Sequence, residues 1–165
     1  MNTEKPGADI TFVSDGARFK YRVCAVIVSD GKLLAERDEV SPYYYLPGGK
    51  VRLGETAENA VIRELREELR VEAEIVRPLY ISQSFFLEEV DGLRYHELCF
   101  YYLVDVSKTD IPERGDSFTM REGKHVHEFE WLGFERLKDE YFYPLFLKTE
   151  ISRLPEHTVV RTDIE

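Results

Sequence analysis

The chain has 165 residues, of which 43% are hydrophobic and 13% aromatic, so we expect one globular domain and exclude a disordered chain. The formal net charge of −10 argues against nucleic acid as the main partner, because a polyanion selects basic proteins. No apolar run approaches the roughly 18 to 20 residues that cross a bilayer, and residues 1–10 lack the pattern of a signal peptide. These features predict a cytoplasmic protein with no membrane partner, in which Cys24 and Cys99 are reduced thiols.

The first part of the chain is expected to contain β-structure. Residues 1–9 are predicted to be a loose tail, and residues 10–165 a single domain. Ile10–Val13 and Phe19–Ser29 have the composition of strands, and Asp30-Gly31 predicts a hairpin turn before a strand at Lys32–Arg37.

A helix is predicted after Thr56, which is a suitable N-cap residue. On a helical wheel that starts at Ala57, the apolar side chains share one arc of roughly 140°. Glu64 and Glu68 fall at the edge of this arc or within it, whereas Glu67 falls outside it. An acidic run on a helix is commonly a solvated face with ion pairs four residues apart. That interpretation accounts poorly for Glu64 and Glu68, because a carboxylate beside a core needs a compensating charge.

The second part of the chain is predicted to return to β-structure. Two long strands are expected at Ala73–Leu87 and Leu93–Val106, followed by a further strand at Val126–Leu132. Residues 107–124 have no clear pattern and are interpreted as a lid or binding loop. A helix at Pro144–Arg153 and a short strand at Thr158–Arg161 complete an α/β or α+β domain.

The segment around the predicted helix resembles the box of the Nudix hydrolases, G-x5-E-x7-R-E-U-x-E-E-x-G-U, where U is a bulky aliphatic residue. Leu46-Pro47-Gly48-Gly49 also resembles the usual lead-in to that box. One position departs, because Arg70 stands where the family has a glycine just beyond the helix. The matching positions are Gly49, Glu55, Arg63, Glu64, Leu65, Glu67, Glu68 and Val71.

The resemblance implies an α/β/α sandwich with a mixed sheet, in which the box forms a loop, a helix and a loop. It implies that Glu64, Glu67 and Glu68, with the carbonyl group of Gly49, bind Mg²⁺ or Mn²⁺. Arg63 would orient Glu55 through a bidentate ion pair, and Glu64 is our first candidate for the general base if it is not fully committed to the metal.

Residues outside the box are weaker candidates for the site. Family members often take a base or a further metal ligand from elsewhere in the chain. The candidates here are Glu97, Glu122 and Glu128. For each of them, the competing interpretation is a solvated carboxylate on the surface. Tyr45, with Tyr43 and Tyr44, flanks the box loop and could stack on a base. His125 and His127 are interpreted as a surface pair or a hydrogen-bonding group for substrate.

The resemblance implies a magnesium-dependent hydrolase of the pyrophosphate bond in nucleoside diphosphate-linked compounds, which releases a nucleoside monophosphate. A nucleoside triphosphate, an oxidised nucleotide and a nucleotide sugar all remain open as the small-molecule substrate. The alternative is a non-catalytic nucleotide-sensing or interaction domain on the same fold. A homodimer is common for this fold and is also left open.

Overall fold

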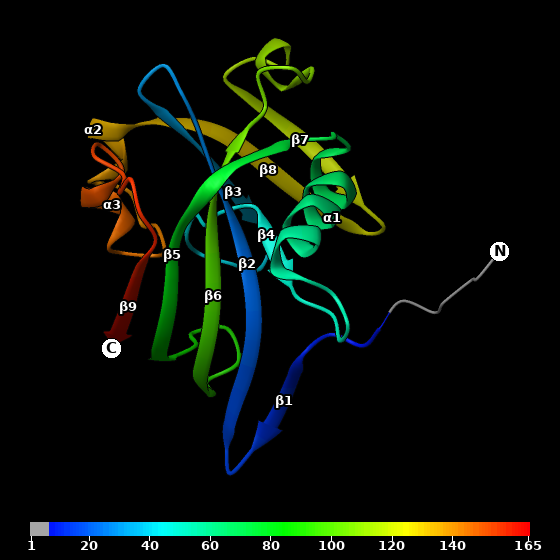
Figure 1. The fold of residues 1–165 in the computed structure, drawn as a ribbon, viewed down its shortest axis with the longest axis vertical. Coiled ribbons are helices and arrows are strands. Elements are labelled where there is room, and N and C mark those ends of the chain that lie inside the picture. The colour runs from blue at the N-terminus through cyan, green and yellow to red at the C-terminus, as the bar shows by residue number, and fades with distance from the viewer. Residues whose placement is uncertain (1–6) are drawn as a thin grey trace, which may run out of the picture.

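The computed structural model describes residues 7–165, and within them nine strands form one mixed sheet (Figure 1). The strand order is β7-β8-β3-β2-β6-β5-β9, and β1 and β4 each pair with β2. The strands are β1 (Thr11–Ser14), β2 (Ala17–Ser29), β3 (Lys32–Asp38), β4 (Gly48–Lys50), β5 (Glu74–Leu87), β6 (Arg94–Asp105), β7 (Ser117–Glu122), β8 (His125–Gly133) and β9 (Val159–Ile164).

Strand β2 lies at the centre of the sheet and is buried on both faces. It runs parallel to β6 and antiparallel to β3. Val23, Ala25 and Ile27 pack into one apolar cluster, and Cys24 and Val26 pack into the other. An unbroken apolar run is typical of a strand that is covered on both sides. The Asp30-Gly31 hairpin between β2 and β3 is confirmed.

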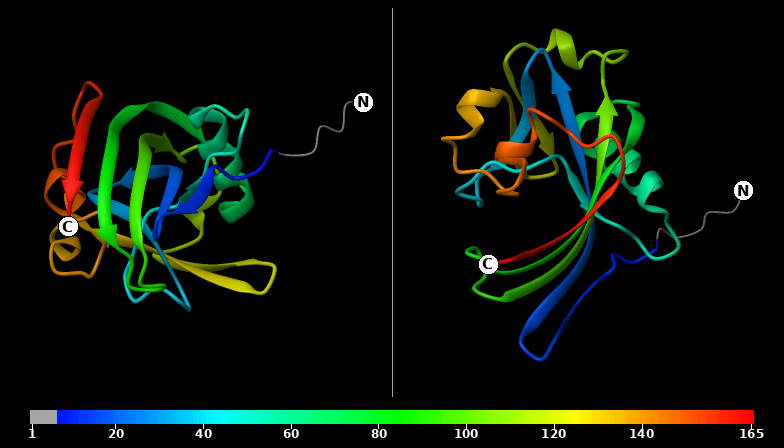
Figure 2. Two further views of the ribbon diagram at one scale, coloured as in Figure 1. Left: turned by 90° about the horizontal axis from the view of Figure 1, so that it is seen from below. Right: turned by 60° about the vertical axis from the view of Figure 1, so that its left-hand side comes forward.

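Helices cover the two faces of the sheet, which confirms the predicted α/β/α sandwich with a mixed sheet. Helix α1 (Ala57–Leu69) packs on one face, and α2 (Phe134–Leu137) and α3 (Leu147–Glu150) lie on the other (Figures 1 and 2). None of the helices within residues 7–165 is long and apolar enough to span a membrane.

Helix α1 begins and ends where the sequence predicts. The Thr56 side chain accepts a hydrogen bond from the Asn59 N–H at 3.1 Å, as an N-cap does. Arg70 follows the last turn in the left-handed conformation, with φ of 56°, so the residue that replaces the family's glycine takes the conformation that glycine favours. The predicted edge position of Glu68 is also confirmed, since its side chain is buried with the apolar stripe.

The prediction of an unpatterned lid over residues 107–124 is wrong. This segment contains a 3₁₀ turn at Ile111–Glu113 and the whole of β7, which pairs with β8. Ile111 is fully buried, and Phe118 and Met120 pack against the core next to α1. The segment therefore belongs to the framework of the domain.

Other parts of the chain also differ from the predictions. The predicted helix at 144–153 is reduced to the single turn of α3, because the amides of residues 147–149 bond to carbonyl groups three residues back rather than four. The short strand β4 and helix α2 were not predicted. The predicted loose tail 1–9 extends beyond the described residues, but its last two residues are attached to the domain, since the Leu53 N–H bonds to the Ala8 carbonyl and Asp9 pairs with Arg52.

Candidate functional site

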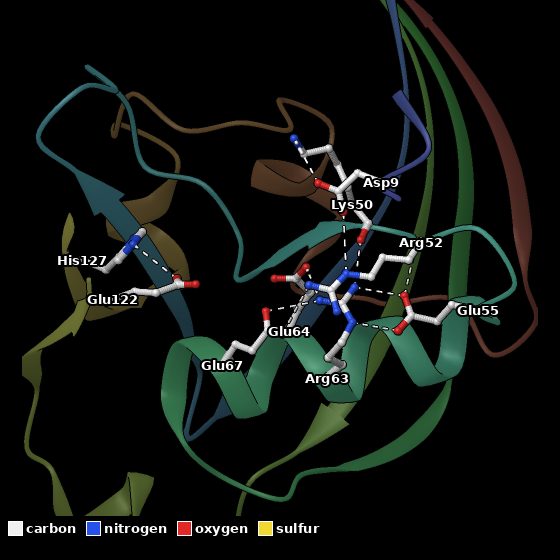
Figure 3. A network of polar contacts seen from close by, with 9 residues as sticks. All are labelled: Asp9, Lys50, Arg52, Glu55, Arg63, Glu64, Glu67, Glu122 and His127. Carbon is white, nitrogen blue, oxygen red and sulfur yellow. Dashed lines mark hydrogen bonds and ion pairs between the residues drawn. The ribbon is translucent and has the colours of Figure 1, made fainter. Parts of the chain in front are cut away.

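Arg63 is the centre of a network of carboxylates on the exposed side of α1 (Figure 3). Its Nε lies 2.7 Å from Glu55 Oε2 and its Nη2 lies 3.0 Å from Glu55 Oε1, which is a bidentate pair. Its Nη1 donates to Glu64 at 2.9 Å and to Glu67 at 3.2 Å. One guanidinium group therefore contacts three of the acidic side chains that the sequence places in the box.

The loop before α1 is held by the same arginine. Arg63 Nη2 also donates to the Lys50 carbonyl at 3.0 Å, at the end of β4. Glu55 accepts a further hydrogen bond from the Arg52 N–H at 3.1 Å. These contacts lower the pKa of the Glu55 carboxyl below its ordinary value, with the Arg63 bond as the largest cause.

Gly49 is the point at which the loop and helix come closest together. A Cβ atom at this position would lie 2.3 Å from the Glu64 carboxyl carbon, so only glycine leaves room for that carboxylate. The surroundings of Glu64 bury it enough to raise its pKa, and the hydrogen bond from Arg63 opposes that rise. The Glu64 carboxylate is therefore partly buried and lies next to the backbone of Gly49.

Glu68 lies one turn further on and has different surroundings. Its side chain is buried, with a relative exposure of 9%, and its Oε2 atom has no hydrogen-bond partner among the described residues. Burial raises the pKa of Glu68 well above its ordinary value, and the neighbouring Glu36 on β3 raises it further.

The sequence did not indicate Glu36 as a site residue, nor its contact with His127. Glu36 is 1% exposed, and His127 Nδ1 lies 2.6 Å from its Oε1 atom. This contact raises the pKa of His127, which was interpreted from the sequence as a surface pair or a substrate contact. The available signal was strand alternation: Glu36 shares a face with Leu34, and His127 shares a face with Phe129, and both of these apolar residues are in the core under α1.

The donor set at this end of the helix fits a hard divalent cation. Glu64, Glu67 and Glu68 offer carboxylate oxygens, and Glu68 has one oxygen that is buried without a partner. Within residues 7–165, no three His, Cys, Asp or Glu side chains converge on one point, because Glu64 and Glu67 are both turned toward Arg63. Binding a cation therefore requires these two side chains to change their rotamers.

A cleft of about 450 Å³ reaches the box at Gly49 and Lys50. It opens on the sheet face that carries Cys24 and Tyr101, opposite the face covered by α1. Tyr45 and Glu97 are among the residues that line it. Glu128 does not line the cleft, because it is exposed on β8 and pairs with Arg37 at 2.6 Å. Glu122 lies near His127, with 3.9 Å between Glu122 Oε2 and His127 Nε2.

The cleft has both basic and aromatic walls. Lys20 and Arg22 line its floor beside Lys50, and Arg22 lies 3.7 Å from Glu97. Burial and the positive charge of Arg22 lower the pKa of Lys20. Tyr43 and Tyr143 form part of the opposite wall and pack edge to face, with ring centres 5.0 Å apart. The cleft therefore offers three cations and several aromatic rings, but acidic side chains line it as well, at Asp38, Glu88, Glu89, Asp91, Glu97, Asp163 and Glu165.

Comparison with known proteins agrees with this geometry. The NUDIX domain model matches residues 18–148. Among solved structures, the chain is similar to a MutT protein from Bacillus halodurans, with 15% identity, a TM-score of 0.58 and coverage of 87% of this chain and 88% of that one. It is also similar to the ORF135 protein of E. coli, with 24% identity, a TM-score of 0.51 and coverage of 84% and 95%.

A third similar structure is an ADP-ribose pyrophosphatase from Streptococcus suis, with 18% identity, a TM-score of 0.51 and coverage of 87% and 98%. Comparison with curated protein sequences finds no significant match. At these identities the solved structures establish the shared fold, and the domain match covers most of the chain. The chain therefore belongs to the Nudix hydrolase family.

Proposed function

We propose that this protein is a magnesium-dependent hydrolase of the pyrophosphate bond in nucleoside diphosphate-linked compounds, with Mn²⁺ as a second usable ion. The supporting observation is the meeting of two features at Gly49. The box carboxylates lie on one side of this residue, and the 450 Å³ cleft opens on the other. A phosphate chain that enters the cleft beside Lys50 would therefore reach the acidic helix.

Nudix hydrolases generally use divalent metal ions. In the proposal Glu64, Glu67 and Glu68 hold the ion, with the carbonyl group of Gly49 as a further ligand. When bound, a divalent cation neutralises phosphate oxygens and lowers the pKa of water. Rotation of Glu64 and Glu67 away from Arg63 would free the oxygens that the ion needs.

The remaining roles follow from the observed contacts. Arg63 keeps its bidentate pair with Glu55, so the loop from Lys50 to Glu55 stays attached to the helix when Glu64 and Glu67 turn. Glu64 is the proposed proton acceptor, because partial burial brings its pKa toward neutral pH, where a base works best. Arg22 and Lys20 would attract the phosphate groups along the cleft floor.

The residues of the box do not determine which chemical group is attached to the diphosphate of the substrate. The ADP-ribose pyrophosphatase shares 18% identity with the chain, so its substrate is one candidate beside nucleoside triphosphates, oxidised nucleotides and nucleotide sugars. Tyr43, Tyr45 and Tyr143 line the cleft and are the proposed stacking surfaces for a base.

The proposal is tested by incubating the purified protein with Mg²⁺ and a panel of these compounds, with product identification by mass spectrometry. We expect a nucleoside monophosphate from at least one member of the panel, and strong loss of turnover in Glu67→Gln and Glu68→Gln. Nucleotide binding without turnover across the whole panel would overturn the proposal in favour of a sensing domain. Unchanged turnover in both variants would show that the glutamates of the box are not needed for the reaction.

We also propose a cytoplasmic location, and we keep a homodimer as the candidate assembly. The location is supported by Cys24 and Cys99, which are free thiols although their sulfur atoms lie 3.5 Å apart in the core. Light scattering and cell fractionation test these two proposals.

A further inference from the structure

Strand β3 brings a carboxylate to α1 from outside the box. Glu36 occupies the same face of β3 as Leu34, which packs in the core under the helix. The position is 1% exposed, so the Glu36 carboxylate has no access to bulk water. A buried carboxylate of this kind is costly unless a positive charge or donors compensate it.

The partners of Glu36 account for only one of its two oxygens. His127 Nδ1 lies 2.6 Å from Oε1, and the Tyr45 hydroxyl lies 3.4 Å from the same atom. The Tyr45 proton goes to Asp38, whose Oδ2 is nearer at 2.7 Å. The second oxygen of Glu36, Oε2, is buried with no partner among the described residues.

Glu68 on α1 resembles Glu36 in having one carboxylate oxygen that lacks a partner within residues 7–165. Its Oε2 atom is also buried without a partner, and Glu36 is the nearest acidic group acting on it. His127 contacts Glu36 through its Oε1 atom and can supply at most one positive charge to the pair. Glu36 and Glu68 are therefore neighbouring buried carboxylates, each of which has one oxygen without a hydrogen-bond partner within residues 7–165.

We propose that Glu36 is a metal ligand from outside the box and that Glu36 and Glu68 together bind a hard divalent cation such as Mg²⁺ or Mn²⁺. Oxygen ligands of this charge suit these ions. His127 is then a positioning residue, since ligand carboxylates are themselves commonly held by hydrogen bonds that fix their orientation. The inference rests on the proposed function in one respect, the assignment of Glu68 to the metal site.

The alternative for two facing carboxylates is a shared proton. The two possibilities differ in what a neutral isostere does. If Glu36 is a ligand, Glu36→Gln removes one ligand of the ion and also removes a like charge from the core. The apo protein should become more stable while the metal binds less tightly. A purely structural Glu36 would leave metal affinity unchanged.

The test is a Mn²⁺ titration of the full-length apo protein by isothermal calorimetry, together with the thermal unfolding midpoint with and without Mn²⁺. The variants are Glu36→Gln, Glu68→Gln and, as a matched control, Glu74→Gln, which removes an exposed carboxylate of β5. We expect Glu36→Gln to weaken Mn²⁺ binding about tenfold or more, to raise the apo midpoint and to reduce the Mn²⁺-induced increase. Glu74→Gln should match the wild type.

Two results would overturn the inference, and they are distinguishable. If Glu36→Gln binds Mn²⁺ as the wild type does while Glu68→Gln does not, Glu36 is not a ligand and the proposed function stands. If the wild type does not bind Mn²⁺ in this titration, both the inference and the metal-dependent function fail.

Discussion

The carboxylates around α1 lie in two surroundings that differ in how their charge is compensated. Glu55, Glu64 and Glu67 all contact the guanidinium of Arg63, at distances of 2.7 to 3.2 Å. Glu68 and Glu36 are more deeply buried, yet each has an oxygen without a partner within residues 7–165. The comparison teaches that the guanidinium of Arg63 contacts every member of the first group, whereas in the second group His127 contacts only Glu36 and one oxygen of each carboxylate is left to an ion or a proton.

Removing Arg63, which contacts all three carboxylates of the first group, should have the largest effect on stability. Arg63→Ala leaves Glu55 and Glu64 half-buried and unpaired and detaches the Lys50 carbonyl, so we expect a loss of about 3 kcal/mol in the free energy of unfolding. Arg63→Lys keeps the charge but loses the bidentate geometry, and its loss should be about half as large. Urea unfolding measures both, and a change below about 0.5 kcal/mol in Arg63→Ala would show that the network is not structural.

Glu55→Gln should have the next largest effect, about 1 to 2 kcal/mol of destabilisation at pH 7. Because Arg63 lowers the pKa of Glu55 below 4.5, the stabilising contribution is fully present above that pH and is lost as the pH falls through the folded-state pKa. The difference between wild type and Glu55→Gln should therefore shrink in acid. Unfolding curves at pH 7 and pH 3 check this, and a difference that grows in acid would contradict it.

Glu68→Gln should change stability in the opposite direction. In the absence of divalent ions it removes one charge from a buried pair of like charges, and we expect a gain of about 1 kcal/mol. The measurement is urea unfolding in EDTA, with Glu74→Gln as the control. Destabilisation by Glu68→Gln would mean that the pair is already compensated in the apo protein, and the contrast between the two groups would disappear.

Arg70→Gly should have the smallest effect on stability. It tests whether a residue at the end of α1, outside the contacts of Arg63, matters to the site. Arg70 adopts φ of 56°, a conformation that costs a residue with a Cβ atom about 1 kcal/mol relative to glycine. The gain is reduced because glycine has more freedom when unfolded, so we expect a stabilisation of a few tenths of a kcal/mol. Activity should be unchanged, since the Arg70 side chain donates to the Arg121 carbonyl at 3.3 Å and contacts none of the box carboxylates within residues 7–165.

The box helix could be predicted from sequence because every signal for it is local. Thr56, the apolar spacing and the positions of Glu64 and Glu68 all lie within one segment, and the structure confirms the bounds and the burial of Glu68. Arg70 at the helix end could be placed for the same reason. Local signals are the ones that a single sequence carries most clearly.

The parts that could not be predicted depend on pairing between distant segments. Glu36 follows three buried residues in a short strand, and only its pairing with β8 and its position under α1 show that it faces inward. Strand β7 was missed because its alternation, Phe118 then Met120, is too short to stand out in a polar segment. The cleft joins residues from β2, β5 and the loop at Tyr43, which no spacing in the sequence brings together.

The most direct test of the account is the metal dependence of turnover on the best substrate from the panel. Specificity constants, kcat/KM, should be measured for the wild type, Glu68→Gln and Glu74→Gln over a range of Mg²⁺ concentrations. The account predicts no turnover in EDTA, a loss of about 100-fold or more in Glu68→Gln at saturating Mg²⁺, and no loss in Glu74→Gln. Equal kcat/KM for the wild type and Glu68→Gln at every Mg²⁺ concentration would contradict it.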